Sequence, residues 1–175
     1  TLFSRKDYIL VRPDADCNAQ GYSATITNKS LTSAKGKMVS NVEDLNSFCE
    51  GDVVLINAKG EITFLYEIKS LHNAVFATER CNHRCIMCPQ PPVVEEEDKT
   101  PMNMKLISLM DKETKEVGIT GGEPTLIGDK LFELIEQIKK YTPKAAISLL
   151  SNGVKFANKE YVFKLAMCRH HDLQV

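Results

Sequence analysis

Apolar and polar positions change their spacing near residue 70. Before it, short apolar runs alternate with polar residues or stop at turn residues, which is typical of β-strands. The last two runs flank Asn57 to Gly60, a spacing that predicts a hairpin, and residues 42–48 are expected to make a short helical turn. We therefore predict a small β-rich region over residues 1–70. Its expected strands are residues 8–12, 23–27, 53–56 and 62–68.

From residue 71 to 175 the pattern becomes strand, loop and helix, repeated three times. The order βαβαβα predicts an α/β fold whose parallel strands are joined by right-handed crossovers. In the clearest helix, residues 129–141, we expect Asp129 to cap the first turn. That helix carries an apolar stripe of Leu131, Leu134, Ile135 and Ile138. The expected strands are 73–78, 116–120 and 145–150, and the other expected helices are 102–112 and 159–169.

Three motifs follow these strands. Cys81, Cys85 and Cys88 come after the first strand, Gly121-Gly122-Glu123-Pro124 after the second, and Ser151-Asn152 after the third. The carboxyl ends of parallel strands lie along one edge of a sheet, where ligands collect. The sequence therefore predicts that all three motifs share one site, whereas the acidic residues 95–98 are expected to form a solvated loop.

Three cysteines within eight residues indicate a metal site rather than a disulfide framework. Thiolates ligate iron–sulfur clusters, and three thiolates hold three irons of a four-iron cluster, which leaves one iron open to another ligand. The alternative is a structural zinc site with His83 as the fourth ligand. His83 stands between two of the cysteines in the sequence, which is an unfavourable position for ligating the same ion. Cys17, Cys49 and Cys168 are isolated and receive no role.

The spacing of the cysteines, together with the downstream Gly-Gly-Glu-Pro, resembles the radical S-adenosylmethionine (SAM) superfamily. This resemblance implies the first half of a partial (β/α) barrel, so we expect further chain beyond the fourth strand that begins near His171. It implies two cofactors, a [4Fe-4S] cluster on the three cysteines and SAM on the open iron. It also implies an external reductant such as flavodoxin or ferredoxin.

The resemblance also assigns roles to residues near the cluster. Gly121 and Gly122 would let backbone carbonyls approach the SAM ammonium, Glu123 would accept from the same ammonium, and Pro124 would turn the backbone away. The SAM ribose or carboxylate would be contacted by Ser151 and Asn152. Many members carry an aromatic residue before the third cysteine, and here Met87 would pack near adenine instead.

A closer resemblance runs from about residue 50 onward. The segments Ala77 to Asn82 and Cys85 to Pro92, with the preceding hairpin, are similar to the His-Xaa-Ser system radical SAM maturases, the HxsC family. This resemblance implies modification of a peptide with His-Xaa-Ser repeats, beside a second radical SAM maturase as partner. Two alternatives stay open: a radical SAM enzyme acting on a small molecule or activating a glycyl-radical enzyme, and a non-enzymatic iron–sulfur electron carrier or redox sensor.

Composition limits the partners. A formal net charge of −1 over 175 residues offers no basic surface for nucleic acid. No apolar run is long enough to span a membrane, and the first residues lack the apolar core of a signal peptide. We therefore expect a cytoplasmic, reducing compartment, which suits free thiols.

Overall fold

The computed structural model describes residues 8–13, 22–29 and 37–175. The chain divides into two compact units, one of Thr1–Glu50 with Leu55–Thr63 and one of Gly51–Val54 with Phe64–Val175. The boundary passes through the two-stranded sheet of β4 (Val53–Ile56) and β5 (Ile62–Tyr66), the hairpin predicted on either side of Asn57 to Gly60. We propose that residues 71–175 form the core domain.

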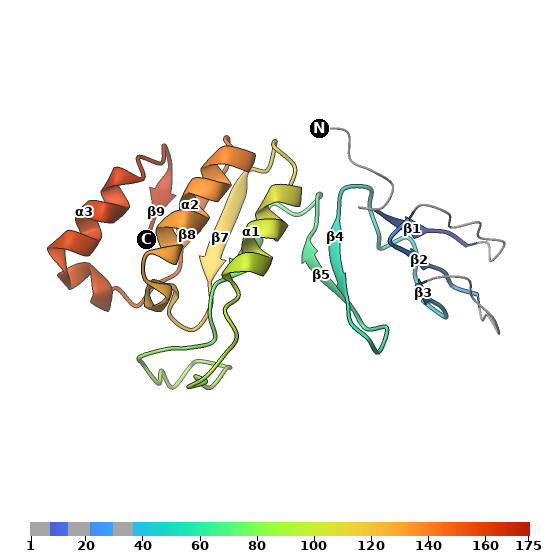
Figure 1. Cartoon of the computed structure of the whole chain (residues 1–175), viewed down its shortest axis with the longest axis horizontal. Coiled ribbons are helices and arrows are strands. Elements are labelled where there is room, and N and C mark those ends of the chain that lie inside the picture. Colours follow the sequence, from blue (N-terminus) through green and yellow to red (C-terminus); the bar gives the residue numbers. More distant parts are fainter. Residues whose placement is uncertain (1–7, 14–21, 30–36) are drawn as a thin grey trace. The chain divides into compact units, whose positions relative to one another are not determined.

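The first unit holds a small parallel sheet (Figure 1). Its strands are β1 (Ile9–Val11), β2 (Ala24–Ile26) and β3 (Met38–Val39), in that order across the sheet. The strands expected at residues 8–12 and 23–27 are confirmed. β3 was not predicted, because two residues are too few to show an alternating pattern.

The helical turn expected over residues 42–48 is wrong, since these residues form a non-helical turn. The Asp44 carboxylate accepts from the backbone N–H of Asn46 at 2.8 Å, and the hydroxyl of Ser47 donates to the Asp44 carbonyl at 3.0 Å. These local side-chain bonds replace those that a helix would need.

The second unit is a parallel four-stranded sheet with helical crossovers (Figure 1). Its order is β6-β7-β8-β9. This is the predicted α/β fold, consistent with the first units of a partial (β/α) barrel, and it includes the fourth strand expected after His171. The strands are β6 (Asn73–Phe76), β7 (Glu116–Thr120), β8 (Ala146–Leu149) and β9 (Leu173–Gln174), and the helices are α1 (Thr100–Leu109), α2 (Lys130–Tyr141) and α3 (Lys159–Met167).

One face of this sheet packs on the helices. Val75, Val117, Ile119 and Ile147 are fully buried there. The apolar stripe predicted for α2 lies against them, and all four of its residues are 0% exposed. Burying side chains of this size contributes about 2 kcal/mol each relative to exposure. The core therefore holds the carboxyl ends of β6, β7 and β8 in register.

The start of α1 and the capping of α2 differ from the predictions, whereas α3 begins at Lys159 as predicted. α1 begins at Thr100, two residues earlier than predicted; its N-cap residue is Lys99, and the Asp98 carboxylate before it accepts from the Thr100 N–H at 3.0 Å. The cap expected from the Asp129 side chain is wrong: it makes no capping bond, and its carboxylate lies 3.2 Å from the Lys164 ammonium. The backbone carbonyl of Asp129 instead accepts from the Phe132 N–H.

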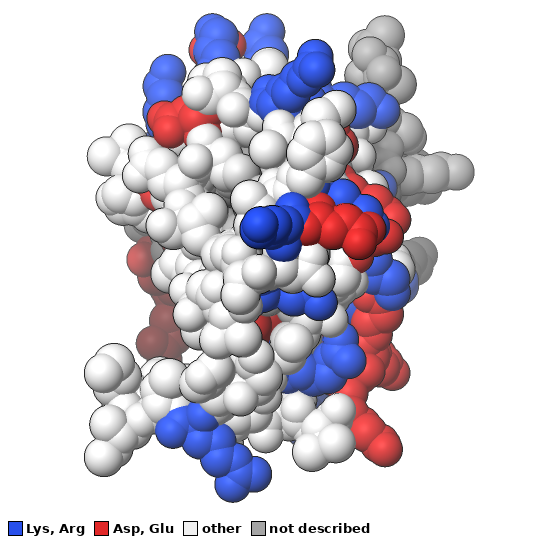
Figure 2. Space-filling model, turned by 90° about the vertical axis from the view of Figure 1, so that its left-hand side faces the viewer, with Lys and Arg blue, Asp and Glu red and all other residues white. Residues whose placement is uncertain are grey.

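β9 forms one edge of the sheet among the described residues. Figure 2 looks at this side of the second unit, where uncharged residues occupy much of the surface between scattered charges. The large exposed apolar side chains of α3 and the residue after β9 are Val162, Phe163, Met167 and Val175. A strand edge beside apolar surface is a place where another element can pack. In the described part of the chain, no helix is long and apolar enough to cross a membrane.

Candidate functional site

The backbone after β7 packs closely against the backbone after β6. The Gly122 N–H donates to the Thr78 carbonyl at 2.7 Å, and the Glu123 N–H donates to the Arg80 carbonyl at 2.8 Å. A side chain on either glycine would collide here: a Cβ on Gly121 would lie 2.3 Å from the Thr78 oxygen, and one on Gly122 would lie 2.3 Å from the Arg80 oxygen. The two glycines are therefore required by the approach of these loops.

Glu123 is the buried centre of the site, with 1% of its surface exposed. Its Oε1 accepts from the N–H and hydroxyl of Thr125 and from the Ser151 hydroxyl at 2.9 Å, and its Oε2 accepts from the Asn152 N–H at 2.7 Å. Burial raises the pKa of this carboxyl, but the four hydrogen bonds together lower it below its ordinary value. Glu123 thus joins the segments that follow β7 and β8.

Asn152 connects the segment after β8 to the cysteine loop. Its side-chain nitrogen donates to Asn82 Oδ1 at 2.7 Å and lies 3.1 Å from His83 Nδ1. Asn82 and His83 stand between the first and second cysteines of the motif. The structure therefore brings together Glu123, Ser151 and Asn152 with the start of the cysteine loop, as the order of the strands predicted.

The three cysteines lie on a loop without helix or strand. Cys81 is half-buried, Cys85 and Cys88 are exposed, and all three are free thiols. The Cys88 N–H donates to the Cys85 carbonyl at 3.0 Å, and the His83 N–H points to the Cys81 sulfur at 3.4 Å. Within the described residues no three His, Cys, Asp or Glu side chains form a metal-binding group. The three thiols therefore share one loop but do not converge on a common point.

The residues present fit an iron–sulfur cluster by the chemistry of their donors. Three free thiols on one short loop can all become thiolates, the ligands that such clusters use. The loop lacks regular backbone bonding that would hold the thiols apart. The histidine that a zinc site would need instead lies beside the Asn152 amide. The donor set therefore suits iron and sulfide better than zinc.

Met87 and Pro124 fall in different surroundings. The side chain of Met87 is 84% exposed on the cysteine loop, so its contact with adenine stays a prediction. Pro124 is buried and begins a short 3₁₀ helix, η2 (Pro124–Ile127), which leads the backbone away from the sheet edge. Glu123 caps that helix by accepting from the Thr125 N–H at 3.0 Å.

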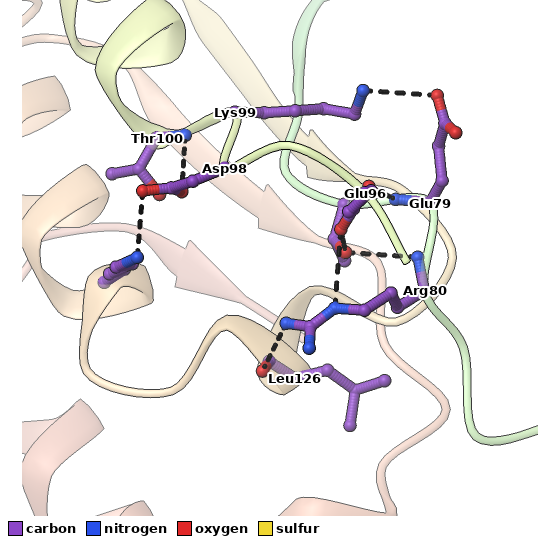
Figure 3. Close-up of polar contacts among 9 residues, drawn as sticks. Glu79, Arg80, Glu96, Asp98, Lys99, Thr100 and Leu126 are labelled. Carbon is purple, nitrogen blue, oxygen red and sulfur yellow. Dashed lines mark hydrogen bonds and ion pairs between the residues drawn. The ribbon is translucent and has the colours of Figure 1, made fainter. Parts of the chain in front are cut away.

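The expectation that residues 95–98 form a solvated loop is wrong at Glu96, whereas Glu95, Glu97 and Asp98 are exposed. Glu96 accepts from the Thr78 hydroxyl and from the Glu79 N–H at 2.6 Å, and Asp98 lies 2.9 Å from the Lys130 ammonium (Figure 3). Burial raises the pKa of Glu96, but these hydrogen bonds and the charges of nearby lysine and arginine lower it overall. In the local sequence, nothing distinguishes Glu96 from the other residues of the acidic run.

We expect replacement of Glu123 by glutamine to destabilise the fold by about 2 kcal/mol, because an amide NH₂ would replace an acceptor that faces hydrogen-bond donors. Chemical unfolding measures the loss, with exposed Glu133→Gln as the control. The stability from a carboxyl with a lowered pKa is lost as the pH falls through that pKa, so the difference from wild type should shrink in acid. Equal stability of the two variants would contradict this role.

Comparison with known proteins agrees with this geometry. The profile of the Radical SAM superfamily matches residues 75–173, which is more than half of the chain. The chain belongs to the radical SAM superfamily. Radical SAM proteins are enzymes that use a [4Fe-4S] cluster and SAM. The matched range runs from β6 to β9 and contains the cysteine loop, the Gly-Gly-Glu-Pro turn and Ser151-Asn152.

Several relatives of this radical SAM chain are named GTP 3′,8-cyclase. The protein of Petrotoga mobilis is 32% identical over 98 residues, covering 53% of this chain and 30% of that protein. The protein of Desulforamulus reducens is 34% identical over 93 residues, covering 47% and 27%. That of Helicobacter pylori strain J99 is 35% identical over 85 residues, covering 45% and 26%. The chain thus matches less than a third of each relative's own length.

Proposed function

We propose that this chain binds a [4Fe-4S] cluster through Cys81, Cys85 and Cys88 and cleaves SAM reductively beside it. The observation that carries the proposal is the hydrogen-bonded junction of three strand ends, in which Glu123 holds Ser151 and Asn152, and Asn152 in turn contacts the cysteine loop. When bound, the reduced cluster supplies the electron that breaks a carbon–sulfur bond of SAM, giving methionine and a 5′-deoxyadenosyl radical.

The side chains around the junction have separate tasks in this proposal. Glu123 fixes the two loops through Oε1, while Oε2 accepts from the Asn152 N–H and keeps a lone pair for the SAM ammonium. The carbonyls of Gly121 and Gly122 are further acceptors for this ammonium. Ser151 and Asn152 would contact the SAM ribose or carboxylate, and Met87 would cover adenine.

Electron paramagnetic resonance tests this proposal on anaerobically reconstituted, dithionite-reduced protein, with and without SAM. We expect a reduced four-iron signal whose g-values shift when SAM is added, because SAM binds the open iron. A cluster signal that is indifferent to SAM would favour an electron carrier or redox sensor. Bound zinc without a cluster would overturn the proposal.

For the substrate we propose a peptide with His-Xaa-Ser repeats. The resemblance of residues 51–92 to the His-Xaa-Ser maturases supports this choice. The sheet face away from the helices carries small residues, including Ala74 and Gly118, whose register places them side by side. An extended peptide could lie close to such a surface.

A small-molecule substrate is the second candidate. The relatives named GTP 3′,8-cyclase favour a purine nucleotide, although their similarity covers about half of this chain and less than a third of their own length. The experiment is the rate of 5′-deoxyadenosine formation with a His-Xaa-Ser repeat peptide, with GTP, and with neither. We expect the peptide to raise this rate above the uncoupled rate; stimulation by GTP alone would assign the second candidate.

The proposed partners follow from the same chemistry. An external one-electron donor such as flavodoxin or ferredoxin would reduce the cluster, and a second radical SAM maturase would act on the same peptide. Adding each to the assay shows whether it increases turnover.

A further inference from the structure

The chain that returns from the cysteine loop contacts the segment before Cys81 through the Val93 N–H, which donates to the Glu79 carbonyl at 3.3 Å, and through the carboxylate of Glu96. Only 10% of its side chain is exposed. It accepts from the Thr78 hydroxyl and from the Glu79 N–H at 2.6 Å, and it lies 3.5 Å from Arg80 Nε (Figure 3). One side chain thus contacts each of the three residues that precede Cys81.

Those three residues are held from the other side as well. The carbonyls of Thr78 and Arg80 accept from the N–H groups of Gly122 and Glu123. The Arg80 guanidinium also donates to the Leu126 carbonyl at 3.3 Å, on the 3₁₀ helix that follows the glycines (Figure 3). The segment before Cys81 is therefore fixed between Glu96 and the Gly-Gly-Glu turn, so its conformation depends on both.

Neighbouring charges reinforce the same arrangement. The Lys99 ammonium lies 3.2 Å from the Glu79 carboxylate, so the residue before α1 also pairs with the segment before Cys81 (Figure 3). The other two glutamates of the acidic run, Glu95 and Glu97, are exposed. Of the three glutamates, only Glu96 is turned inward to the end of β6.

We propose that Glu96 is a positioning residue for the cluster. By ordering Thr78 to Arg80, its carboxylate sets the direction in which Cys81 leaves the sheet and the distance between the cysteine loop and the Gly-Gly-Glu turn. Because SAM must reach both the open iron and that turn, Glu96 then sets SAM affinity without touching SAM. The effect on SAM affinity rests on the proposed function, whereas the ordering of residues 78–80 by Glu96 does not require a cluster.

The test compares Glu96→Gln with Glu97→Gln, which removes the same charge from an exposed position in the same run. In the protein without cluster, hydrogen exchange read by mass spectrometry reports the order of residues 78–93. We expect amides there to exchange about 10-fold faster in Glu96→Gln than in Glu97→Gln, the factor for one hydrogen bond to a charged group. Equal exchange in the two variants would overturn the proposal.

The second readout uses reconstituted protein. We expect Glu96→Gln to weaken SAM binding by about 10-fold and to change the g-values of the reduced cluster, while Glu97→Gln matches wild type in both. Thr78→Val removes a hydroxyl that donates to Glu96 and accepts from the Arg80 N–H at 3.1 Å, and it should have the same effects, less than additively with Glu96→Gln. Matching SAM affinities for the two glutamate variants would overturn the proposal. If the wild-type protein binds no cluster, the proposed function is wrong, and the hydrogen-exchange comparison still tests the role of Glu96.

Discussion

Replacing Cys85 with serine is expected to abolish cluster assembly. Serine presents an alcohol that is not ionised at neutral pH and is a harder donor than a thiolate, so one iron of the cluster loses its ligand. Iron content after anaerobic reconstitution should fall from about four atoms per chain to near zero. The signal of the reduced cluster and the formation of 5′-deoxyadenosine should be lost with it. Cys81→Ser and Cys88→Ser should behave alike.

The other cysteines provide the matched controls. Cys49→Ser removes one thiol from outside the motif, and Cys168→Ala removes a thiol that is buried beside α3, where burial raises its pKa and disfavours the thiolate. Both variants should retain the iron content of wild type. Loss of iron in either control, or its retention in Cys85→Ser, would show that the ligand assignment is wrong. Cys17 lies outside the described residues and is tested in the same way.

The core of the second unit could be predicted because its signal is local. The stripe of Leu131, Leu134, Ile135 and Ile138 recurs at helical spacing, and the structure buries all four. β7 was predicted at Glu116–Thr120, the bounds that the structure gives. The convergence of the strand ends followed from topology alone, since parallel strands place their carboxyl ends on one edge. These inferences needed no contact between distant residues.

The role of Glu96 could not be predicted, because its partners are far away in the sequence. Its hydrogen bonds reach back 17 and 18 residues, across the whole cysteine loop. Local composition showed only an acidic run, which is usually solvated. The capping prediction for Asp129 was wrong for a related reason. Its carboxylate pairs with Lys164 on α3, a residue far away in the sequence, instead of capping α2. The periodicity of apolar residues does not predict the contacts of polar side chains whose partners are distant in the sequence.

The glycines of the Gly-Gly-Glu turn have a structural role in addition to the one predicted for ligand binding. The sequence assigned them to the approach of a ligand, and the structure shows that they also permit the approach of Thr78 and Arg80. Gly121 has φ +150°, a conformation that favours glycine. The two roles predict different results for the protein without SAM: close packing of the loops makes glycine necessary for stability, whereas ligand approach alone does not.

Replacing Gly122 with alanine is expected to destabilise the second unit and to prevent SAM binding. The new Cβ would lie 2.3 Å from the Arg80 oxygen and 2.9 Å from the Glu79 oxygen, so the backbones must separate. Separation weakens the bonds from Gly122 to Thr78 and from Glu123 to Arg80. Together, overpacking and lost hydrogen bonds should cost about 3 kcal/mol, measured by urea unfolding without cluster or SAM. SAM affinity is measured separately on reconstituted protein.

Gly128→Ala separates this collision from backbone strain. Gly128 has φ +65° and ψ −132°, a conformation that favours glycine, but a Cβ there would meet nothing within 4 Å, so only the cost of backbone strain, about 2 kcal/mol, is expected, with SAM binding retained. If Gly122→Ala costs no more than Gly128→Ala without ligand but still loses SAM, the glycine serves only ligand approach. If it is destabilised before any ligand is present, the close packing of the two loops is what requires glycine, and SAM affinity falls because the site between them is displaced.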